Sequence, residues 1–234
     1  MATPQEKLAD ALEALRTLQD QGGVAIRSSD LSRLHRERLV RNGFLQEVMK
    51  GWYIPVRGDA GAGESTDWYA AYWPFCAAYL SSRFGGAWCL SPEQSLALHA
   101  GNRTVPRQLW VRATRAGNKP TALLFGTSLF DLRASLPAAA DTVVKEGLRL
   151  YALPAALIAV SPGYFRHQTI DARAALAGFR TAAEVLGPLL EGGHSVIAGR
   201  LAGAFRNIGR HAIADEIGDA MRAAGYALHE SDPF

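Results

Sequence analysis

Residues 27–55 read RSSDLSRLHRERLVRNGFLQEVMKGWYIP, and this stretch decides the fold of the first quarter of the chain. Its Ser28-Ser29-Asp30 run offers side-chain oxygens that can cap the backbone N–H groups of a helix beginning near Leu31. Glycine commonly ends a helix, so we expect this helical stretch to end at Gly43. Beyond it, apolar residues lie on both sides of Lys50-Gly51, which is typical of a β-hairpin. We therefore predict helical structure followed by a hairpin.

The segment before this stretch predicts a longer helix. Leucine and alanine recur at helical spacing between Pro4 and Gln21, and Gly22-Gly23 is expected to stop the helix. Val-Ala-Ile at 24–26 is a short strand candidate. Helix, short strand, two helices and hairpin is the order of a winged helix-turn-helix, which we place at residues 1–56. Residues 57–64 are small and polar, so we interpret them as a linker.

Positive charge is concentrated in this first domain. The whole chain has 25 Lys and Arg residues against 22 Asp and Glu residues, which gives a net charge of +3. Residues 27–57 alone hold seven basic and three acidic side chains, a net charge of +4. Such a cluster is the electrostatic footprint of a DNA-binding module, because Lys and Arg release the counterions of the phosphate backbone.

The basic helix in this cluster is predicted to enter the major groove. Leu34, Leu39 and Val40 are expected to face the core. Arg36 and Arg38 are expected to be the first contacts with bases or phosphates, while the hairpin tip acts as a wing. The predicted DNA contacts are Arg27, Ser29, Arg33, His35, Arg36, Arg38, Arg41, Asn42, Lys50 and Trp52. The alternative is a solvated basic helix on a domain that binds another protein.

Residues 65–234 predict a second domain of mixed α and β structure. Aromatic and alanine residues at helical spacing over 67–80 indicate a buried helix, with Trp68, Tyr72 and Phe75 in its core. Ser91, with Pro92 at the first helical position, indicates a helix that reaches about residue 100. The other expected elements are strands at 108–113, 123–125, 148–153 and 227–229, and helices from 154 and at 171–191, 196–208 and 212–224. The predicted fold class is α+β.

Two groups of arginines in the second domain predict a further basic patch. One group surrounds the strand expected at 108–113, and the other follows the penultimate helix and its turn. We expect them to bind a second stretch of phosphate backbone or an acidic partner; the alternative is a solvated helix face. The residues are Arg103, Arg107, Arg112, Arg200, Arg206 and Arg210.

The sequence contains no recognisable catalytic or metal-binding pattern. Cys76 and Cys89 lack the paired spacing of a zinc site and lie in apolar sequence, so we expect buried free thiols. The six histidines are scattered, and His99 is expected to be a hydrogen-bonded residue at a helix end. We therefore predict a protein that is not an enzyme and uses no metal or cofactor.

The sequence also lacks membrane signals. Its first residues do not form the basic and then apolar pattern of a signal peptide. No segment has the roughly 18 consecutive apolar residues of a membrane span. We expect a cytoplasmic protein that does not bind a membrane.

Several motifs resemble AbiEi-type antitoxins of type IV toxin–antitoxin systems. The likeness rests on Ser-Ser-Asp-Leu at 28–31, Arg-Asn-Gly-Phe-Leu at 41–45 and Val-Met-Lys-Gly-Trp-Tyr at 48–53. It continues in the second domain through Leu-Ser-Pro-Glu-Gln-Ser-Leu-Ala-Leu-His at 90–99. The resemblance spans most of the chain and is strongest in the first 55 residues. It implies that residues 33–42 and 47–53 bind DNA.

What the resemblance implies for function is autorepression combined with toxin control. Such antitoxins bind inverted repeats upstream of their own operon, and their C-terminal domain neutralises a nucleotidyltransferase-like toxin. Because an inverted repeat has two half-sites, two winged helices are needed, either in a homodimer or in monomers that bind cooperatively. The expected partners are double-stranded DNA and a toxin.

A second likeness concerns residues 199–226 and Asp232-Pro233-Phe234, which resemble the segment that precedes a Fic domain in some longer bacterial proteins. The chain has no His-Pro-Phe…Gly-Asn-Gly-Arg loop, so it cannot transfer a nucleotidyl group by that chemistry. Residues 142–147 match the string of a Fic inhibitory helix, although their β-branched residues favour an extended segment. The alternative function is therefore a regulatory region of, or an inhibitory partner for, a Fic-type enzyme.

Overall fold

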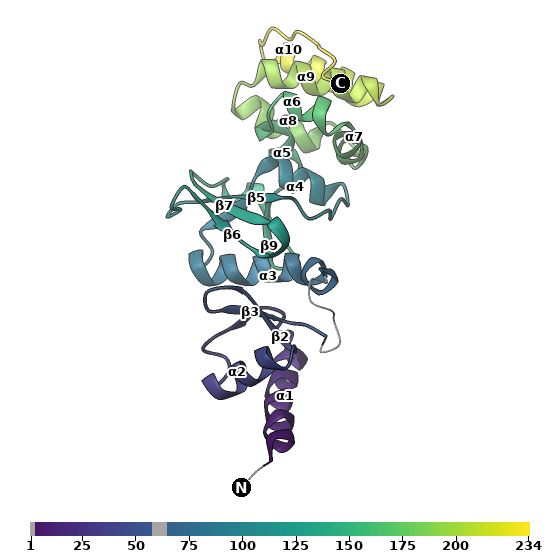
Figure 1. Cartoon of the computed structure of the whole chain (residues 1–234). Coiled ribbons are helices and arrows are strands. Elements are labelled where there is room, and N and C mark those ends of the chain that lie inside the picture. The colour runs from purple at the N-terminus through teal and green to yellow at the C-terminus, as the bar shows by residue number, and fades with distance from the viewer. Residues whose placement is uncertain (1–2, 58–64) are drawn as a thin grey trace. The chain divides into compact units, whose positions relative to one another are not determined.

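The computed structural model describes residues 3–57 and 65–234, and its mixture of helices and sheets belongs to the α+β class. The chain forms two compact units. Unit 1 draws on residues 1–88, 105–136 and 144–149, and unit 2 on residues 89–104, 137–143 and 150–234. Figure 1 follows the elements along the chain by colour. The predicted division into 1–56 and 65–234 has other limits and stays a prediction, and residues 58–64 of the predicted linker lie outside the described residues.

Unit 1 begins with a helix, a short strand, a second helix and a hairpin, arranged as a winged helix. Helix α1 (Pro4–Asp20) starts with a capping box, in which the side chains of Thr3 and Glu6 accept each other's backbone N–H groups. Strand β1 (Ile26–Arg27), helix α2 (Arg33–Arg41) and strands β2 (Leu45–Met49) and β3 (Trp52–Pro55) follow. The strands form an antiparallel sheet of order β1-β3-β2. The core of the motif contains Ala11, Leu15, Ile26, Leu31, Leu39, Leu45 and Tyr53.

The turn of this motif differs from the prediction. We expected two helices between the short strand and the hairpin, but the described chain forms only α2 there, and residues 28–31 are a turn. The cap of α2 is Ser32, whose side chain accepts the N–H of His35 at 3.2 Å. Asp30, one of the predicted cap residues, instead accepts the N–H of Arg27 at 2.8 Å. Its side chain therefore stabilises the turn and not the helix.

Helix α3 (Thr66–Phe84) supplies the aromatic core of unit 1. Trp68, Tyr72 and Phe75 are fully buried, as predicted. The helix lies beside β3 (Figure 1). The ring of Trp52 on β3 meets Phe75 and Tyr79 edge-on, with centroids 6.0 and 5.5 Å apart. Aromatic packing therefore joins the wing to α3.

A sheet built on β5 (Gln108–Ala113), which has the predicted bounds, extends unit 1. β5 pairs in parallel with β7 (Ser128–Arg133), and β6 (Lys119–Ala122) pairs antiparallel with β7. Strand β4 (Trp88–Leu90) completes the sheet, whose strand order is β4-β5-β7-β6. The boundary between the two units falls within β4. The strand predicted at 123–125 is wrong, because Phe125 and Gly126 have positive φ and form a 3-10 turn.

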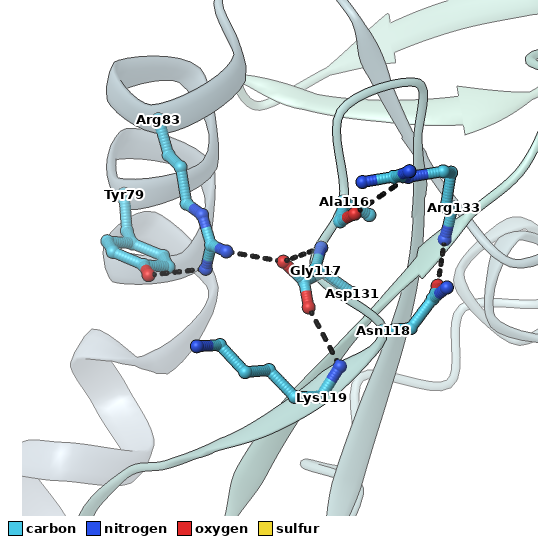
Figure 2. A network of polar contacts seen from close by, with 8 residues as sticks. All are labelled: Tyr79, Arg83, Ala116, Gly117, Asn118, Lys119, Asp131 and Arg133. Atoms are coloured by element: carbon cyan, nitrogen blue, oxygen red, sulfur yellow. Dashed lines mark hydrogen bonds and ion pairs between the residues drawn. The ribbon is translucent and has the colours of Figure 1, made fainter.

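A polar network joins α3 to this sheet (Figure 2). Arg83 Nη2 on α3 forms an ion pair with Oδ2 of Asp131 on β7 at 2.5 Å, and Asp131 is fully buried. The carboxylate also accepts the N–H groups of Gly117 and Lys119, at 3.2 and 3.4 Å. Arg83 Nη1 donates to the Tyr79 hydroxyl at 2.9 Å. Because the buried acid has a donor at each oxygen, the network holds the loop before β6 against α3 and has a structural role.

Unit 2 is mostly helical. Helix α4 (Pro92–His99) begins at the predicted Ser91 cap, whose side chain accepts the N–H of Gln94. His99 ends this helix, and its Nε2 lies 2.8 Å from the Tyr151 carbonyl oxygen, which confirms the predicted hydrogen-bonded role. The later helices are α5 (Leu153–Ala159), α6 (Gly163–His167), α7 (Thr169–Ala177), α8 (Ala183–Glu191), α9 (Ser195–Asn207) and α10 (His211–Ala223).

Several expectations for the second half of the chain need correction. The helix predicted at 171–191 is two helices, α7 and α8, and the five-residue α6 was not predicted. The strand predicted at 227–229 does not form. Residues 142–147 form β8 (Thr142–Lys145) and a turn into β9 (Leu148–Tyr151), because Glu146 and Gly147 have positive φ. The string that matches a Fic inhibitory helix is therefore extended.

Cys76 and Cys89 are buried free thiols, as predicted. Burial raises the pKa of the Cys76 thiol well above its usual range, so this thiol stays protonated at neutral pH. Within residues 3–57 and 65–234, no group of three or more His, Cys, Asp or Glu side chains is placed to hold a metal ion. No helix of the described chain has both the length and the apolar character needed to cross a membrane.

Candidate nucleic-acid interface

Helix α2 turns one side inward and the opposite side to solvent. Leu39 is fully buried in the core of the winged helix. Leu34, five residues earlier, lies about 140° away around the helix, and 68% of it is exposed. Val40 is 42% exposed. The prediction that Leu34 and Val40 face the core is therefore wrong, and both side chains are accessible to a partner.

The outer face of α2 consists of Leu34, Glu37 and Arg41. They are three and then four residues apart, which places them on one side of a helix, and all three are exposed. At its edge, Arg33 Nε donates to the Glu37 carboxylate at 2.7 Å. This hydrogen bond and the charge of Arg33 hold the pKa of Glu37 below its ordinary value. The outer face thus offers an apolar side chain, a carboxylate and guanidinium donors.

Arg36 and Arg38 are both engaged by main-chain acceptors of other elements. Arg36 Nη1 donates to the Ser28 carbonyl oxygen at 2.7 Å, and its guanidinium lies 5.8 Å from the centre of the Tyr53 ring. Arg38 Nη1 donates to the Lys7 carbonyl oxygen at 2.9 Å. Both residues are half-buried. They fix α2 to the turn, to β3 and to α1, so their predicted role as the first DNA contacts has less geometric support than a role for Arg41.

Arg27 and Ser29 both serve the turn before α2. The N–H and Nε of Arg27 donate to Asp30 Oδ2 at 2.8 and 3.4 Å, and Ser29 Oγ donates to Asp30 Oδ1 at 3.2 Å. Burial of the Asp30 carboxyl raises its pKa, but the hydrogen bonds and the charge of Arg27 outweigh this effect and hold the pKa below 3.8. The turn therefore depends on an ionised Asp30.

The wing is a tight hairpin at Lys50-Gly51. Gly51 has a φ of +82°, a left-handed conformation that favours glycine. Its N–H donates to Glu47 Oε1 at 3.3 Å, and its carbonyl oxygen accepts the N–H of Ser28 at 2.9 Å. Lys50 is exposed at the tip. The Trp52 ring is instead occupied by its packing on α3.

The two remaining predicted contacts lie at the ends of α2. Asn42 follows the last turn as the C-cap, and its Nδ2 donates to the Arg38 carbonyl oxygen at 2.8 Å. It is exposed. His35, in the first turn, is half-buried. Asn42 is thus better placed than His35 to contact a DNA backbone.

The second predicted basic patch does not form one free surface. Arg200 is 9% exposed, and its guanidinium lies 5.7 Å from the centre of the Phe165 ring. Arg206 pairs with Asp215 and Glu230, at 2.7 and 2.6 Å. Arg210 donates to the Ala177 carbonyl oxygen at 3.1 Å. These three arginines are engaged within unit 2. Arg103, also in unit 2, is exposed. In unit 1, Arg107 is exposed and Arg112 is half-buried.

The outer face was not predicted because Leu34 and Leu39 were both assigned to the core. Once Leu39 is placed in the core, the helical angle alone puts Leu34 outside. The anchoring role of Arg36 and Arg38 was not predicted for a different reason. Their carbonyl acceptors, on Ser28 and Lys7, belong to other elements, and helical spacing within residues 33–41 contains no information about them.

The comparisons with known proteins support the fold. The sequence matches no protein-family model and no curated protein. Among solved structures, the chain is similar to the crystal structure of the RV2827C protein from Mycobacterium tuberculosis, with a TM-score of 0.57 over 90% of this chain and 80% of that chain. The two sequences are 15% identical. At this identity the likeness concerns the fold alone, and it places this chain beside that structure in architecture.

Proposed function

We propose that this protein is a DNA-binding transcriptional regulator that inserts α2 into the major groove. The observation that carries the proposal is the outer face of α2, with Leu34, Glu37 and Arg41 exposed on a helix that other elements of unit 1 anchor. Arg36 and Arg38 hold the helix in place through main-chain acceptors. A rigid helix lowers the entropic cost of binding, because the reading side chains are already presented.

Each exposed group has a partner of matching chemistry in DNA. Leu34 can pack on the methyl group of a thymine, which projects into the major groove. Arg41 and Arg33 can donate to a guanine or to phosphates, and Glu37 can accept from a cytosine amino group. Lys50 at the wing tip supplies a phosphate contact.

The biological role that we propose is that of an AbiEi-type antitoxin. The protein would repress its own operon at an inverted repeat, as a homodimer or as cooperating monomers, and neutralise a nucleotidyltransferase-like toxin in the cytoplasm. This extension rests on the motifs at 28–31, 41–45, 48–53 and 90–99. The Fic-type alternative has less support, because residues 142–147 are extended and not helical.

Salt-dependent binding to the DNA upstream of the protein's own gene tests the DNA role. We expect Arg41→Ala to weaken binding and to reduce the slope of log K against log salt by about 0.9, because one phosphate or base contact by a cation is lost. Fluorescence anisotropy with a labelled duplex measures both quantities. Arg222→Ala is the matched control, since Arg222 is an exposed arginine on α10.

Two results of this titration would count against the proposal. Unchanged affinity and salt slope in Arg41→Ala would contradict the assignment of the outer face. An equal effect of Arg222→Ala would show that general charge, and not this face, drives binding. In cells, Arg41→Ala should still neutralise the toxin, because the resemblance assigns that role to the second domain.

A further inference from the structure

Residues 227–234 lie along α9 in unit 2 without forming a helix or a strand. The N–H of Ser231 donates to the Gly199 carbonyl oxygen at 3.3 Å. Gly199 and Gly203 are one turn apart on α9, and a methyl group on either would overlap a carbonyl oxygen of the segment, that of His229 or of Ser231 respectively. The two glycines therefore form the floor of a groove that a main chain fills at close range.

Side chains beside the groove recognise the acidic residues of the segment. Arg206 binds Glu230 through two hydrogen bonds, Nε to Oε1 at 2.6 Å and Nη2 to Oε2 at 3.1 Å. Asn207 Nδ2 donates to Asp232 Oδ2 at 2.6 Å. A bidentate arginine is specific for a planar carboxylate. The groove therefore selects acidic residues two positions apart.

The far end of the groove holds an aromatic ring. Pro233 is buried, and the ring of Phe234 meets Phe165 edge-on with centroids 5.7 Å apart. The guanidinium of Arg173 lies 4.4 Å from the centre of the Phe234 ring. Arg173 Nη2 also donates to Asn207 Oδ1 at 2.7 Å, which connects the aromatic subsite to the acidic one.

The contacts that hold the segment can be replaced by the contacts of another peptide. The side chains of Arg206 and Glu230 are 39% and 35% exposed, so water and salt reach the ion pair. Next to the aromatic subsite, the buried Nε of Arg200 has no hydrogen-bond partner among the described residues.

From this geometry we propose that α9 carries a peptide-binding groove for an extended segment of the pattern acidic, any residue, acidic, proline, aromatic. Residues 230–234 occupy the groove in the free chain. A partner protein that presents the same pattern displaces them. The groove lies within unit 2 and is independent of the DNA role proposed for α2.

The test opens the groove in the full chain and adds the segment as a separate peptide. Glu230→Ala with Asp232→Ala removes the acidic contacts of the chain's own segment and leaves Gly199, Gly203 and Arg206 intact. We expect a fluorescent peptide of residues 227–234 to bind this opened variant at least about tenfold more tightly than it binds the wild-type chain. The reason is that the wild-type segment competes at a high effective concentration.

Two controls identify the groove as the binding site. Adding Gly203→Ala to the opened variant should abolish peptide binding, because the new methyl group takes the place of the Ser231 carbonyl oxygen. Adding Gly187→Ala on α8 should leave peptide binding unchanged, since no atom outside its chain neighbours and the backbone of its own helix lies within 4 Å of that methyl group. A peptide with Gln and Asn in place of Glu230 and Asp232 should bind at least about tenfold more weakly.

The same measurements can overturn the proposal. It fails if the opened variant, with unchanged circular dichroism, does not bind the peptide, or if Gly203→Ala leaves binding unchanged. Hydrogen exchange at residues 227–234 gives an independent readout, and faster exchange in the opened variant is the expected result. A segment that stays protected there would show that its acidic residues do not hold it in the groove.

Discussion

Leu34 and Leu39 lie on one short helix, and the fold places them in opposite environments. Leu39 contributes to the core of the winged helix, while Leu34 is 68% exposed beside Glu37 and Arg41. An exposed leucine is ordinary on a protein surface. Its position on the outer face of a helix that is anchored by Arg36 and Arg38 gives it the proposed function.

Asp30 makes the stability of the winged helix sensitive to acid. The pKa of this carboxyl is held below 3.8, so its contribution is complete above about pH 5 and is lost as the pH falls through the lowered pKa. We expect Asp30→Asn to cost about 1–2 kcal/mol at pH 7, because hydrogen bonds to a charged acceptor are weakened. Urea unfolding of both proteins between pH 7 and pH 3 measures the difference.

The gap in stability between wild type and Asp30→Asn should narrow below about pH 4. This narrowing follows because the wild-type carboxyl becomes protonated and resembles the amide of the variant. Asp20→Asn is a suitable control, since Asp20 is an exposed acid at the end of α1. A gap of constant size down to pH 3 would contradict the role assigned to Asp30.

In unit 1, the buried carboxylate of Asp131 joins α3 to the sheet. Arg83 on α3 and Asp131 on β7 pair at 2.5 Å, and two main-chain N–H groups complete the site (Figure 2). We expect Asp131→Ala to destabilise the protein by about 3 kcal/mol, because the guanidinium and both N–H groups lose their acceptor. Chemical denaturation followed by tryptophan fluorescence measures the loss.

A double-mutant cycle separates the ion pair from general packing. Arg83→Met removes the charge and keeps the length of the side chain. If the pair is the source of the stability, the double variant Arg83→Met with Asp131→Ala should lose less than the sum of the two single losses. Additive losses would show that Arg83 and Asp131 stabilise the fold independently.

Elements whose signals are local were predicted well. The helices α1, α3, α4, α9 and α10 and strand β5 follow from periodicity, caps and glycine stops near their ends. The wrong predictions occur where a contact with another element determines the local structure. Residues 227–229 were predicted as a strand but lie along the glycines of α9, and residues 124–126 turn because Phe125 and Gly126 have positive φ.

The predicted DNA site shows the same division at the level of side chains. The location of the site, on α2 and the hairpin tip, follows from the charge in residues 27–57. The sequence does not reveal which of these side chains are available to a partner. Arg36 and Arg38 are engaged by the Ser28 and Lys7 carbonyl groups, and Trp52 is engaged by the rings of α3. Such long-range partners have no signature in a single sequence.

At the scale of the whole molecule, two proposed binding surfaces belong to different units. The outer face of α2 lies in unit 1, and the groove on α9 lies in unit 2. A regulator that binds DNA with one unit and a protein partner with the other would join repression to partner recognition. Variants of the two surfaces should therefore act independently, which makes each a control for the other.

In the proposed function, Leu34 and its neighbours on α2 read bases. The most direct test of this claim is the affinity of wild type and Leu34→Ala for the bound upstream DNA, with each thymine replaced in turn by uracil. We predict one position at which loss of the methyl group weakens wild type about fourfold, the equivalent of about 0.8 kcal/mol for one apolar contact. Leu34→Ala should not respond at that position. A wild-type protein insensitive to every replacement, or an equal loss in Leu34→Ala, would contradict the claim.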